Sequence, residues 1–138
     1  SYRKTKLKKG EFIYSIKIPI NKNKIFKAYK ISKRFDDDIS SVCGSFSFLI
    51  NKNKITKVAI AYGGMSEIPK RATTIEKKLI NSEFSENTFS KAVNLINKDF
   101  SPLDDMRASK NYRINVAKNL LLKAFYEIKN RQKIRINS

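Results

Sequence analysis

An alternating apolar pattern on either side of a short polar turn constrains this chain more than any other feature. The apolar residues of the first run, 42–50, recur at every second position, and residues 55–62 form a second β-prone run. A period of two places one set of side chains on one face of a strand. In the first run that face comprises Val42, Gly44, Phe46, Phe48 and Ile50. With the polar segment 51–54 as its turn, the sequence predicts a β-hairpin that Gly63 and Gly64 end.

Two further segments, which precede the hairpin, have the composition of strands. In residues 12–18 every second side chain is apolar, the side chains between them are both apolar and polar, and Pro19 ends the run. The alternating apolar residues are Phe12, Tyr14, Ile16 and Ile18. Residues 25–31 are rich in apolar and aromatic side chains, so both segments are predicted to be strands. The charged run 33–38 after the second segment is predicted to be a loop.

After Pro69 the apolar spacing is helical. A first helix is predicted over residues 69–80, because proline is tolerated in a first turn. A second is predicted to begin at an N-cap formed by Ser85, and a third to follow residues 101–105. The apolar positions are Ala72, Ile75 and Leu79 in the first helix, Phe89, Ala92, Val93 and Ile96 in the second, and Tyr112, Val116, Leu120, Leu121, Phe125 and Ile128 in the third.

The order of these elements predicts the fold class. Strands come first and helices follow, without the alternation that builds a parallel sheet. We therefore expect an α+β domain in which an antiparallel sheet of three to four strands carries about three helices on one face. A length of 138 residues suits one hydrophobic core. No apolar run approaches the roughly 20 residues of a membrane span, so no membrane contact and a cytoplasmic location are expected.

The formal net charge of +18 has three explanations that composition leaves open. Lysines occur in every segment, as a compositional bias toward Lys, Asn and Ile would produce. A surface that binds phosphate groups would give the same total. So would a domain that faces acidic surfaces in a larger assembly.

A basic nucleic-acid-binding module is the first function class that this charge suggests. The third predicted helix carries basic side chains that are expected to lie away from its apolar side. They are Arg107, Lys110, Arg113, Lys118 and Lys123. No helix-turn-helix, zinc-finger or ribonucleoprotein motif accompanies them, so the case rests on charge alone and no specific nucleic-acid partner is expected.

Few residues suit catalysis or metal binding. The chain has no histidine and one cysteine, Cys43, which is expected to be a small structural residue in the core of the hairpin. The run Asp36-Asp37-Asp38 could supply oxygen ligands to a divalent cation, but it lacks the glycine and distal glutamate of a calcium loop. A solvated loop with local ion pairs accounts for it better. We therefore predict no catalytic residue and no metal site.

Four segments, taken in order, resemble one family. They are Glu11-Phe12-Ile13-Tyr14-Ser15-Ile16-Lys17-Ile18-Pro19, Tyr29-Lys30-Ile31-Ser32-Lys33-Arg34-Phe35-Asp36-Asp37-Asp38-Ile39, Tyr62-Gly63-Gly64-Met65 and Arg107-Ala108-Ser109-Lys110-Asn111-Tyr112-Arg113. Together they resemble the FAD-containing part of xanthine dehydrogenases, which are molybdenum hydroxylases. The resemblance implies that residues 1–25 end a preceding FAD-binding region and that residues 26–138 form the C-terminal domain, similar to that of the CO dehydrogenase flavoprotein.

The resemblance also implies cofactors and partners. In this family electrons pass from a molybdenum cofactor through two 2Fe-2S clusters to FAD, which reduces NAD or oxygen. The implied partners are the preceding FAD-binding subdomains, an iron–sulfur domain and a molybdenum-binding subunit. Neither a glycine-rich phosphate-binding segment nor the cluster cysteines occur in this sequence, so the chain is expected to bind FAD weakly and to be inactive alone. A related hydroxylase acting on carbon monoxide, an aldehyde or a heterocycle would carry the same domain.

Position by position, the resemblance implies five FAD-contacting residues. They are Ile13, through its backbone, Lys30, Arg34, Asp37 and Asp38. A lysine near the flavin would stabilise the negative charge that develops on reduction. Residues 33–39 are implied to form a loop beside the isoalloxazine ring, with Arg34 and Asp37 the most important. Residues 63–64 and 107–109 are expected to be architectural, as a tight turn and the entry to the last helix.

Overall fold

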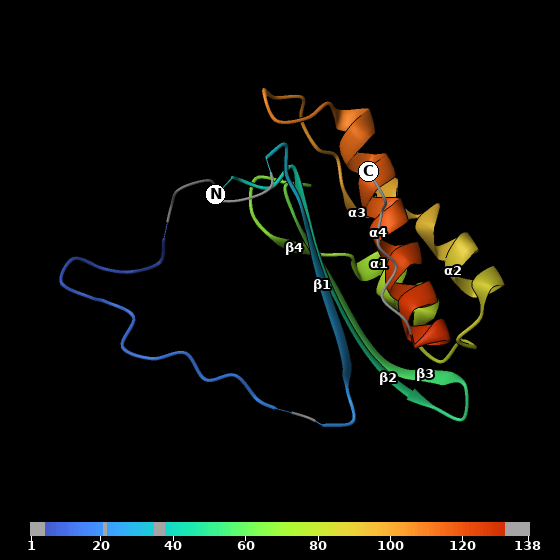
Figure 1. Cartoon of the computed structure of the whole chain (residues 1–138). Helices are drawn as coiled ribbons and strands as arrows, with labels where there is room; N and C mark the ends of the chain where they lie inside the picture. Colours follow the sequence, from blue (N-terminus) through green and yellow to red (C-terminus); the bar gives the residue numbers. More distant parts are fainter. Residues whose placement is uncertain (1–4, 21, 35–37, 132–138) are drawn as a thin grey trace.

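The computed structural model describes residues 5–20, 22–34 and 38–131. In these ranges a four-stranded antiparallel sheet, in the order β1-β2-β3-β4, carries the helices on one face (Figure 1). The strands are β1 (Ile25–Ile31), β2 (Val42–Asn51), β3 (Lys54–Gly63) and β4 (Lys70–Arg71). The helices are α1 (Thr73–Leu79), α2 (Glu86–Val93), α3 (Ile96–Asp99) and α4 (Lys110–Asn130). The predicted α+β class is confirmed, and α3 adds a short fourth helix.

The predicted hairpin is formed by β2 and β3. Their pairing runs from Cys43 opposite Gly63 to Asn51 opposite Lys54. Lys52 and Asn53 in the turn have φ values of 45° and 60°. Positive φ at both central residues is the geometry of the two-residue turn that matches strand twist, so the short polar turn directly sets the register of the pair.

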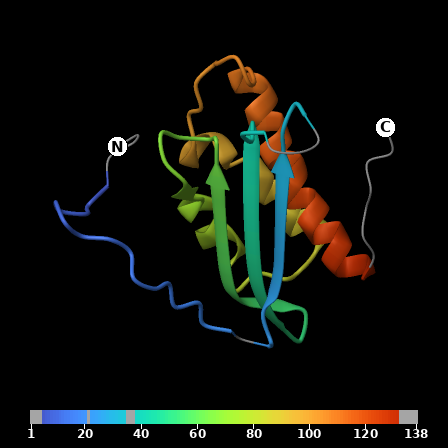
Figure 2. The same cartoon turned by 60° about the vertical axis from the view of Figure 1, so that its left-hand side comes forward.

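The core lies between the hairpin and the helices. Phe46 and Phe48 are fully buried on the face of β2 that packs against α4, and the Phe48 ring lies 5.8 Å from the Phe89 ring of α2 between centroids. Phe89 of α2 and Phe125 of α4 contact each other there, with ring centroids 4.7 Å apart. The layer arrangement is visible in Figure 2, where the helices lie behind the strands. The prediction that the hairpin phenylalanines and Phe89 belong to the core is confirmed.

Helix α1 begins later than predicted. Lys70 and Arg71, assigned to a helix from the sequence, instead pair with Tyr62 and Ala61 at the edge of the sheet. The helix starts at Thr73, where the Asp99 carboxylate accepts hydrogen bonds of 2.9 and 3.1 Å from the Thr74 amide. This cap comes from the last residue of α3, which local periodicity around Thr73 cannot reveal.

The other two predicted helices form with adjustments. Ser85 caps α2 as predicted, whereas Ile96 belongs to the separate helix α3. Helix α4 begins after an N-cap at Ser109, as expected for an architectural segment. Its buried face comprises Arg113, Ile114, Ala117, Leu120, Leu121, Ala124, Phe125 and Glu127, so Tyr112 is not a core residue and the predicted exposure of Arg113 is wrong.

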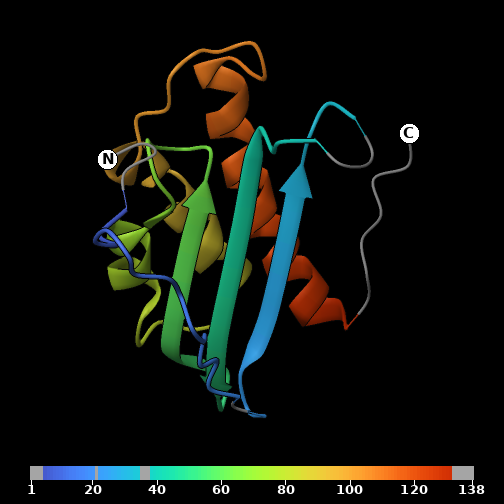
Figure 3. The ribbon, with the colours of Figure 1, turned by 90° about the vertical axis from the view of Figure 1, so that its left-hand side faces the viewer.

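Residues 11–20 do not form the predicted strand. They are extended and exposed, and within the described ranges no other strand pairs with them. A strand requires partners for its N–H and C=O groups, and the edge of this sheet does not supply them here. The segment lies on the side of the sheet opposite the helices (Figures 1 and 3).

As for membranes, none of the helices described is long and apolar enough to cross one.

Candidate functional site

One face of the sheet is left uncovered by the helices. Figure 3 shows this face toward the viewer, with the helices behind it. Residues that pair directly across an antiparallel ladder share a face, so its members follow from the register. This outer face comprises Phe26, Ala28, Lys30, Cys43, Ser45, Ser47, Leu49, Lys57, Ala59, Ala61, Gly63 and, on the edge strand, Arg71. It is flat, because most of these side chains are small, and its charged members, Lys30, Lys57 and Arg71, are all basic.

Lys30 lies at the end of the outer face where the β2–β3 ladder stops. It pairs with Cys43, which pairs with Gly63, and these three residues are here named the Lys30 row. The next row along the strands is Ala28, Ser45 and Ala61. An exposed ammonium group therefore stands beside a platform of small side chains. Such a platform admits a planar ring within reach of the cation.

Cys43 differs from its predicted place. Its strand neighbours Val42 and Gly44 face the core, and the alternation turns Cys43 outward, where it is partly exposed. The expectation of a small structural residue assumed that the thiol faced inward. The thiol is instead an accessible group in the Lys30 row.

The loop between β1 and β2 brings two predicted cofactor residues together. Arg34 Nε lies 3.3 Å from Asp38 Oδ2, and Asp38 Oδ1 accepts a 2.8 Å hydrogen bond from the Ile39 amide. The hydrogen bond from Arg34 is the main reason why the pKa of Asp38 lies below its ordinary value. Asp38 is therefore a carboxylate at neutral pH. Asp37 lies outside the described residues, as do Phe35 and Asp36.

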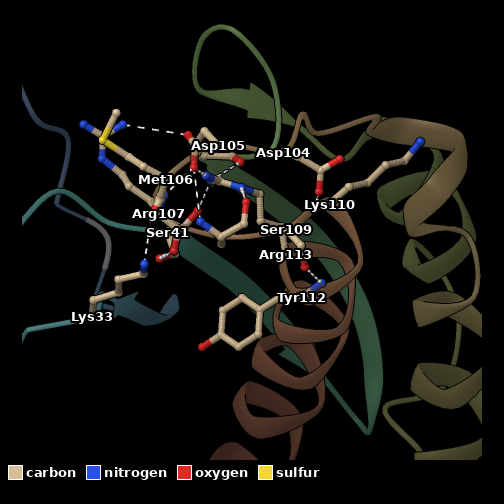
Figure 4. Close-up of polar contacts among 12 residues, drawn as sticks. Lys33, Ser41, Asp104, Asp105, Met106, Arg107, Ser109, Lys110, Tyr112 and Arg113 are labelled. Carbon is tan, nitrogen blue, oxygen red and sulfur yellow. Dashed lines mark hydrogen bonds and ion pairs between the residues drawn. The ribbon is translucent and has the colours of Figure 1, made fainter.

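Ser41 anchors the end of this loop. Its amide donates to the Ile31 carbonyl at 2.8 Å, which closes the loop where β1 ends and β2 begins. Its hydroxyl donates to the Arg107 carbonyl at 3.1 Å, and Lys33 Nζ donates to the Met106 carbonyl at 2.7 Å (Figure 4). Both described ends of the loop are thus held against the segment that precedes α4.

Ile13 is not part of this cluster. It belongs to the extended segment 11–20, and 66% of its surface is exposed. The structure therefore brings Arg34 and Asp38 together, places Lys30 on the adjoining face, and leaves Ile13 on a separate segment.

Two residues around the site were not predicted to contribute to it. Ser41 belongs to no recognisable sequence motif, and its role depends on contacts with residues that are distant in the sequence. Arg113 was assigned to the surface, although it stands four residues before Ala117 and seven before Leu120, both buried. That helical spacing was the signal that could have placed it inside.

Comparison with known proteins gives the family. Residues 27–128 match the family described as CO dehydrogenase flavoprotein C-terminal domain. The glyceraldehyde dehydrogenase medium chain of Sulfolobus acidocaldarius is 29% identical over 125 residues, which is 90% of this chain and 44% of the relative. Xanthine dehydrogenase of Emericella nidulans is 33% identical over 104 residues, covering 72% of this chain and 8% of the relative. The chain thus spans less than half of either relative.

Solved structures share the fold. A reconstituted CO dehydrogenase from Oligotropha carboxidovorans superimposes with a TM-score of 0.73 at 20% identity, over 85% of this chain and 40% of the other. Quinoline 2-oxidoreductase from Pseudomonas putida 86 gives 0.67 at 18% identity, over 77% and 37%. The resemblance inferred from the four sequence segments is confirmed.

Proposed function

Because this chain belongs to the CO dehydrogenase flavoprotein C-terminal domain family, we propose that its outer face covers the isoalloxazine ring of FAD in a molybdenum hydroxylase. The observation that carries this proposal is the position of Lys30. Its side chain stands on an uncovered, flat face beside small residues, where a planar ring can lie close to the sheet. The loop carrying Arg34 and Asp38 adjoins the same end.

The residues present fit the edge of a flavin and not its phosphates. The outer face offers one cation at the Lys30 row and no acidic side chain. When bound, FAD supplies a ring that accepts electrons from iron–sulfur clusters and passes them to NAD or oxygen. Lys30 stabilises the negative charge that reduction places on such a ring. Arg34 and Asp38 form an ion pair near the same end of the face, where their charges contribute to the local field.

The rest of the parent protein follows from the same proposal. Residues 1–25 would end the preceding FAD-binding region, whose surface would cover the exposed apolar segment that includes Ile13 and Tyr14. The complex would add a 2Fe-2S domain and a molybdenum-binding subunit in the cytoplasm. The identity to xanthine dehydrogenase supports a purine substrate with NAD as acceptor. The longer match to a glyceraldehyde dehydrogenase chain favours an aldehyde as the second candidate.

Alkylation of Cys43 tests whether the outer face is covered. It is the only cysteine of this chain, it is partly exposed and it belongs to the Lys30 row. In this chain alone, iodoacetamide is expected to label it readily and FAD to give little protection. In the complete flavoprotein, FAD is expected to slow labelling at least about tenfold, since a covered thiol reacts only through rare opening. Peptide mass spectrometry separates Cys43 from the other cysteines of the complete protein.

Two controls make the result specific. Adenosine diphosphate in place of FAD occupies the nucleotide site but lacks the isoalloxazine ring, so Cys43 should stay reactive. Labelling of the denatured protein gives the upper limit of the rate. Equal Cys43 rates with and without FAD, in a flavoprotein shown by its absorbance to have bound the cofactor, would contradict the proposal.

Replacing Lys30 with methionine in the complete flavoprotein is expected to lower the flavin reduction potential. The variant removes the cation that stabilises the reduced ring, and a loss of about 1.4 kcal/mol corresponds to about 30 mV for a two-electron couple. Spectroelectrochemical titration measures the shift. Lys57→Met is the matched control, because Lys57 lies on the same face six residues from Gly63, about 20 Å along the strand. Equal shifts in the two variants would indicate only a general charge effect.

A further inference from the structure

Arg113 is a buried cation at the end of the sheet that carries the Lys30 row. Only 4% of its side chain is exposed. Its Nη1 donates to the carbonyl oxygens of Ser41 and, at 2.9 Å, Gly64, as Figure 4 shows in part. Its Nη2 lies 2.5 Å from Asp105 Oδ1, and its Nε donates to the Ala108 carbonyl at 3.4 Å. One side chain of α4 therefore joins the start of β2, the end of β3 and the segment before α4.

The position of these contacts in the ladder is informative. Pairing between β2 and β3 stops at Cys43 opposite Gly63. Ser41 and Gly64 lie just beyond this last pair, where the backbone ladder no longer holds the two strands. By donating to both carbonyls, Arg113 Nη1 links the two strands with charge-assisted hydrogen bonds where backbone pairing has stopped. The Cys43–Gly63 pair at the end of the ladder is therefore held in place and does not fray. Lys30, which pairs with Cys43, is held with it.

Asp105 holds the guanidinium from the other side. Its Oδ1 also accepts hydrogen bonds from the amides of Arg107 and Ala108, at 2.8 and 3.1 Å. Partial burial raises the pKa of Asp105, but the hydrogen bonds from these amides and from Arg113 outweigh it and bring the pKa below its ordinary value. The carboxylate therefore stays charged at neutral pH, and the buried cation keeps its partner.

We propose that Arg113 is a positioning residue for the Lys30 row, which it fixes by clamping Ser41 to Gly64 beyond the end of the ladder. This inference rests on the proposed function in one respect, namely that the row faces the flavin. The clamping itself concerns this chain alone and can be measured without any cofactor.

The first measurement uses the chain without FAD. Arg113→Met removes every donor of the clamp and keeps an apolar side chain close in length to the aliphatic part of arginine. We expect its Cys43 thiol to react with iodoacetamide at least about threefold faster than in the wild type, because the strand ends open locally. The Ser41 amide, which donates to Ile31, is expected to exchange its hydrogen correspondingly faster. Arg113→Lys keeps one cationic donor and should give intermediate rates.

Arg71→Met is the matched control. Arg71 is also a guanidinium in an ion pair, with Glu76, but 53% of its side chain is exposed and it lies on β4. This variant should leave both rates at the wild-type values. A folded Arg113→Met protein with wild-type rates at Cys43 and Ser41 would overturn the proposal. If that variant does not fold, Arg113→Lys and Asp105→Asn decide, and wild-type rates in both would overturn it equally.

The second measurement uses the complete flavoprotein. Arg113→Met is expected to shift the visible absorption bands of bound FAD and to weaken FAD binding several-fold, whereas Lys57→Met, at the far end of the outer face, changes neither. In the chain alone, faster alkylation of Cys43 in Arg113→Met than in the wild type would support the clamp. If FAD did not shield Cys43 in the wild-type flavoprotein, that result would contradict the proposed function and leave the clamp standing. The two failures are therefore distinguishable.

Discussion

Replacing Gly64 with alanine is expected to lower the free energy of unfolding by about 3 kcal/mol. The backbone at Gly64 has a φ of 78°, a left-handed conformation that costs an alanine about 1–2 kcal/mol. A Cβ at this position would also meet the Ser41 carbonyl oxygen at 2.3 Å and Arg113 Nη1 at 3.1 Å. Relieving such an overlap costs about 1–3 kcal/mol, because backbone must move. Urea unfolding followed by circular dichroism measures the difference.

The neighbouring glycine supplies the control. A Cβ on Gly63 would lie 3.7 Å from the Cys43 Cβ, which is an ordinary contact. Gly63→Ala is therefore expected to change the free energy of unfolding by less than about 0.5 kcal/mol. Equal losses in the two variants would show that the close approach of Gly64 to Ser41 is not what requires glycine.

The predictable part of this fold is the part encoded by local patterns. The hairpin follows from alternation over residues 42–50 and from a polar turn whose Asn53 tolerates positive φ. The caps at Ser85 and Ser109 likewise act within three residues, through Thr88 and Tyr112. Such signals depend on the chain within a few residues, so they can be read directly from sequence.

The parts that could not be predicted depend on long-range partners. The start of α1 is set by Asp99, which lies 25 residues after Thr74. Arg113 contacts Ser41 across 72 residues, and no local pattern marks an arginine that binds a carbonyl that far away. Residues 11–20 have the alternation of a strand but no partner strand in the described chain, so the pattern alone predicted too much.

For the candidate site, local pattern predicts the orientation of Lys30 but not its ligand. Alternation within β1 places Lys30 on the face opposite Tyr29, whose hydroxyl donates to the buried Glu127 of α4 at 2.9 Å. The direction of Lys30 therefore follows from the sequence pattern. Its assignment to FAD came from the family resemblance, because nothing in the spacing of a single lysine specifies a flavin.

Replacing Phe125 with alanine is expected to cost about 4 kcal/mol, the typical loss for a phenylalanine deleted from a core. Phe125 is fully buried, and its ring lies 4.7 Å from Phe89 and 5.0 Å from Phe84 between centroids. No small rearrangement of the two neighbouring rings fills the space that the Phe125 ring leaves. A loss of this size is a large fraction of the roughly 5–15 kcal/mol that stabilises a typical domain, so the urea midpoint should fall sharply.

Phe26→Ala makes the same chemical change on the outer face, where 63% of the side chain is exposed. It is expected to alter the unfolding free energy of this chain by less than about 0.5 kcal/mol. In the complete flavoprotein, however, a covered outer face would make the same variant weaken FAD retention, measured as the flavin released on dilution. A large loss of stability in the chain alone would mean that Phe26 belongs to the core. A normal FAD content and release rate in the complete protein would argue against a partner surface over β1.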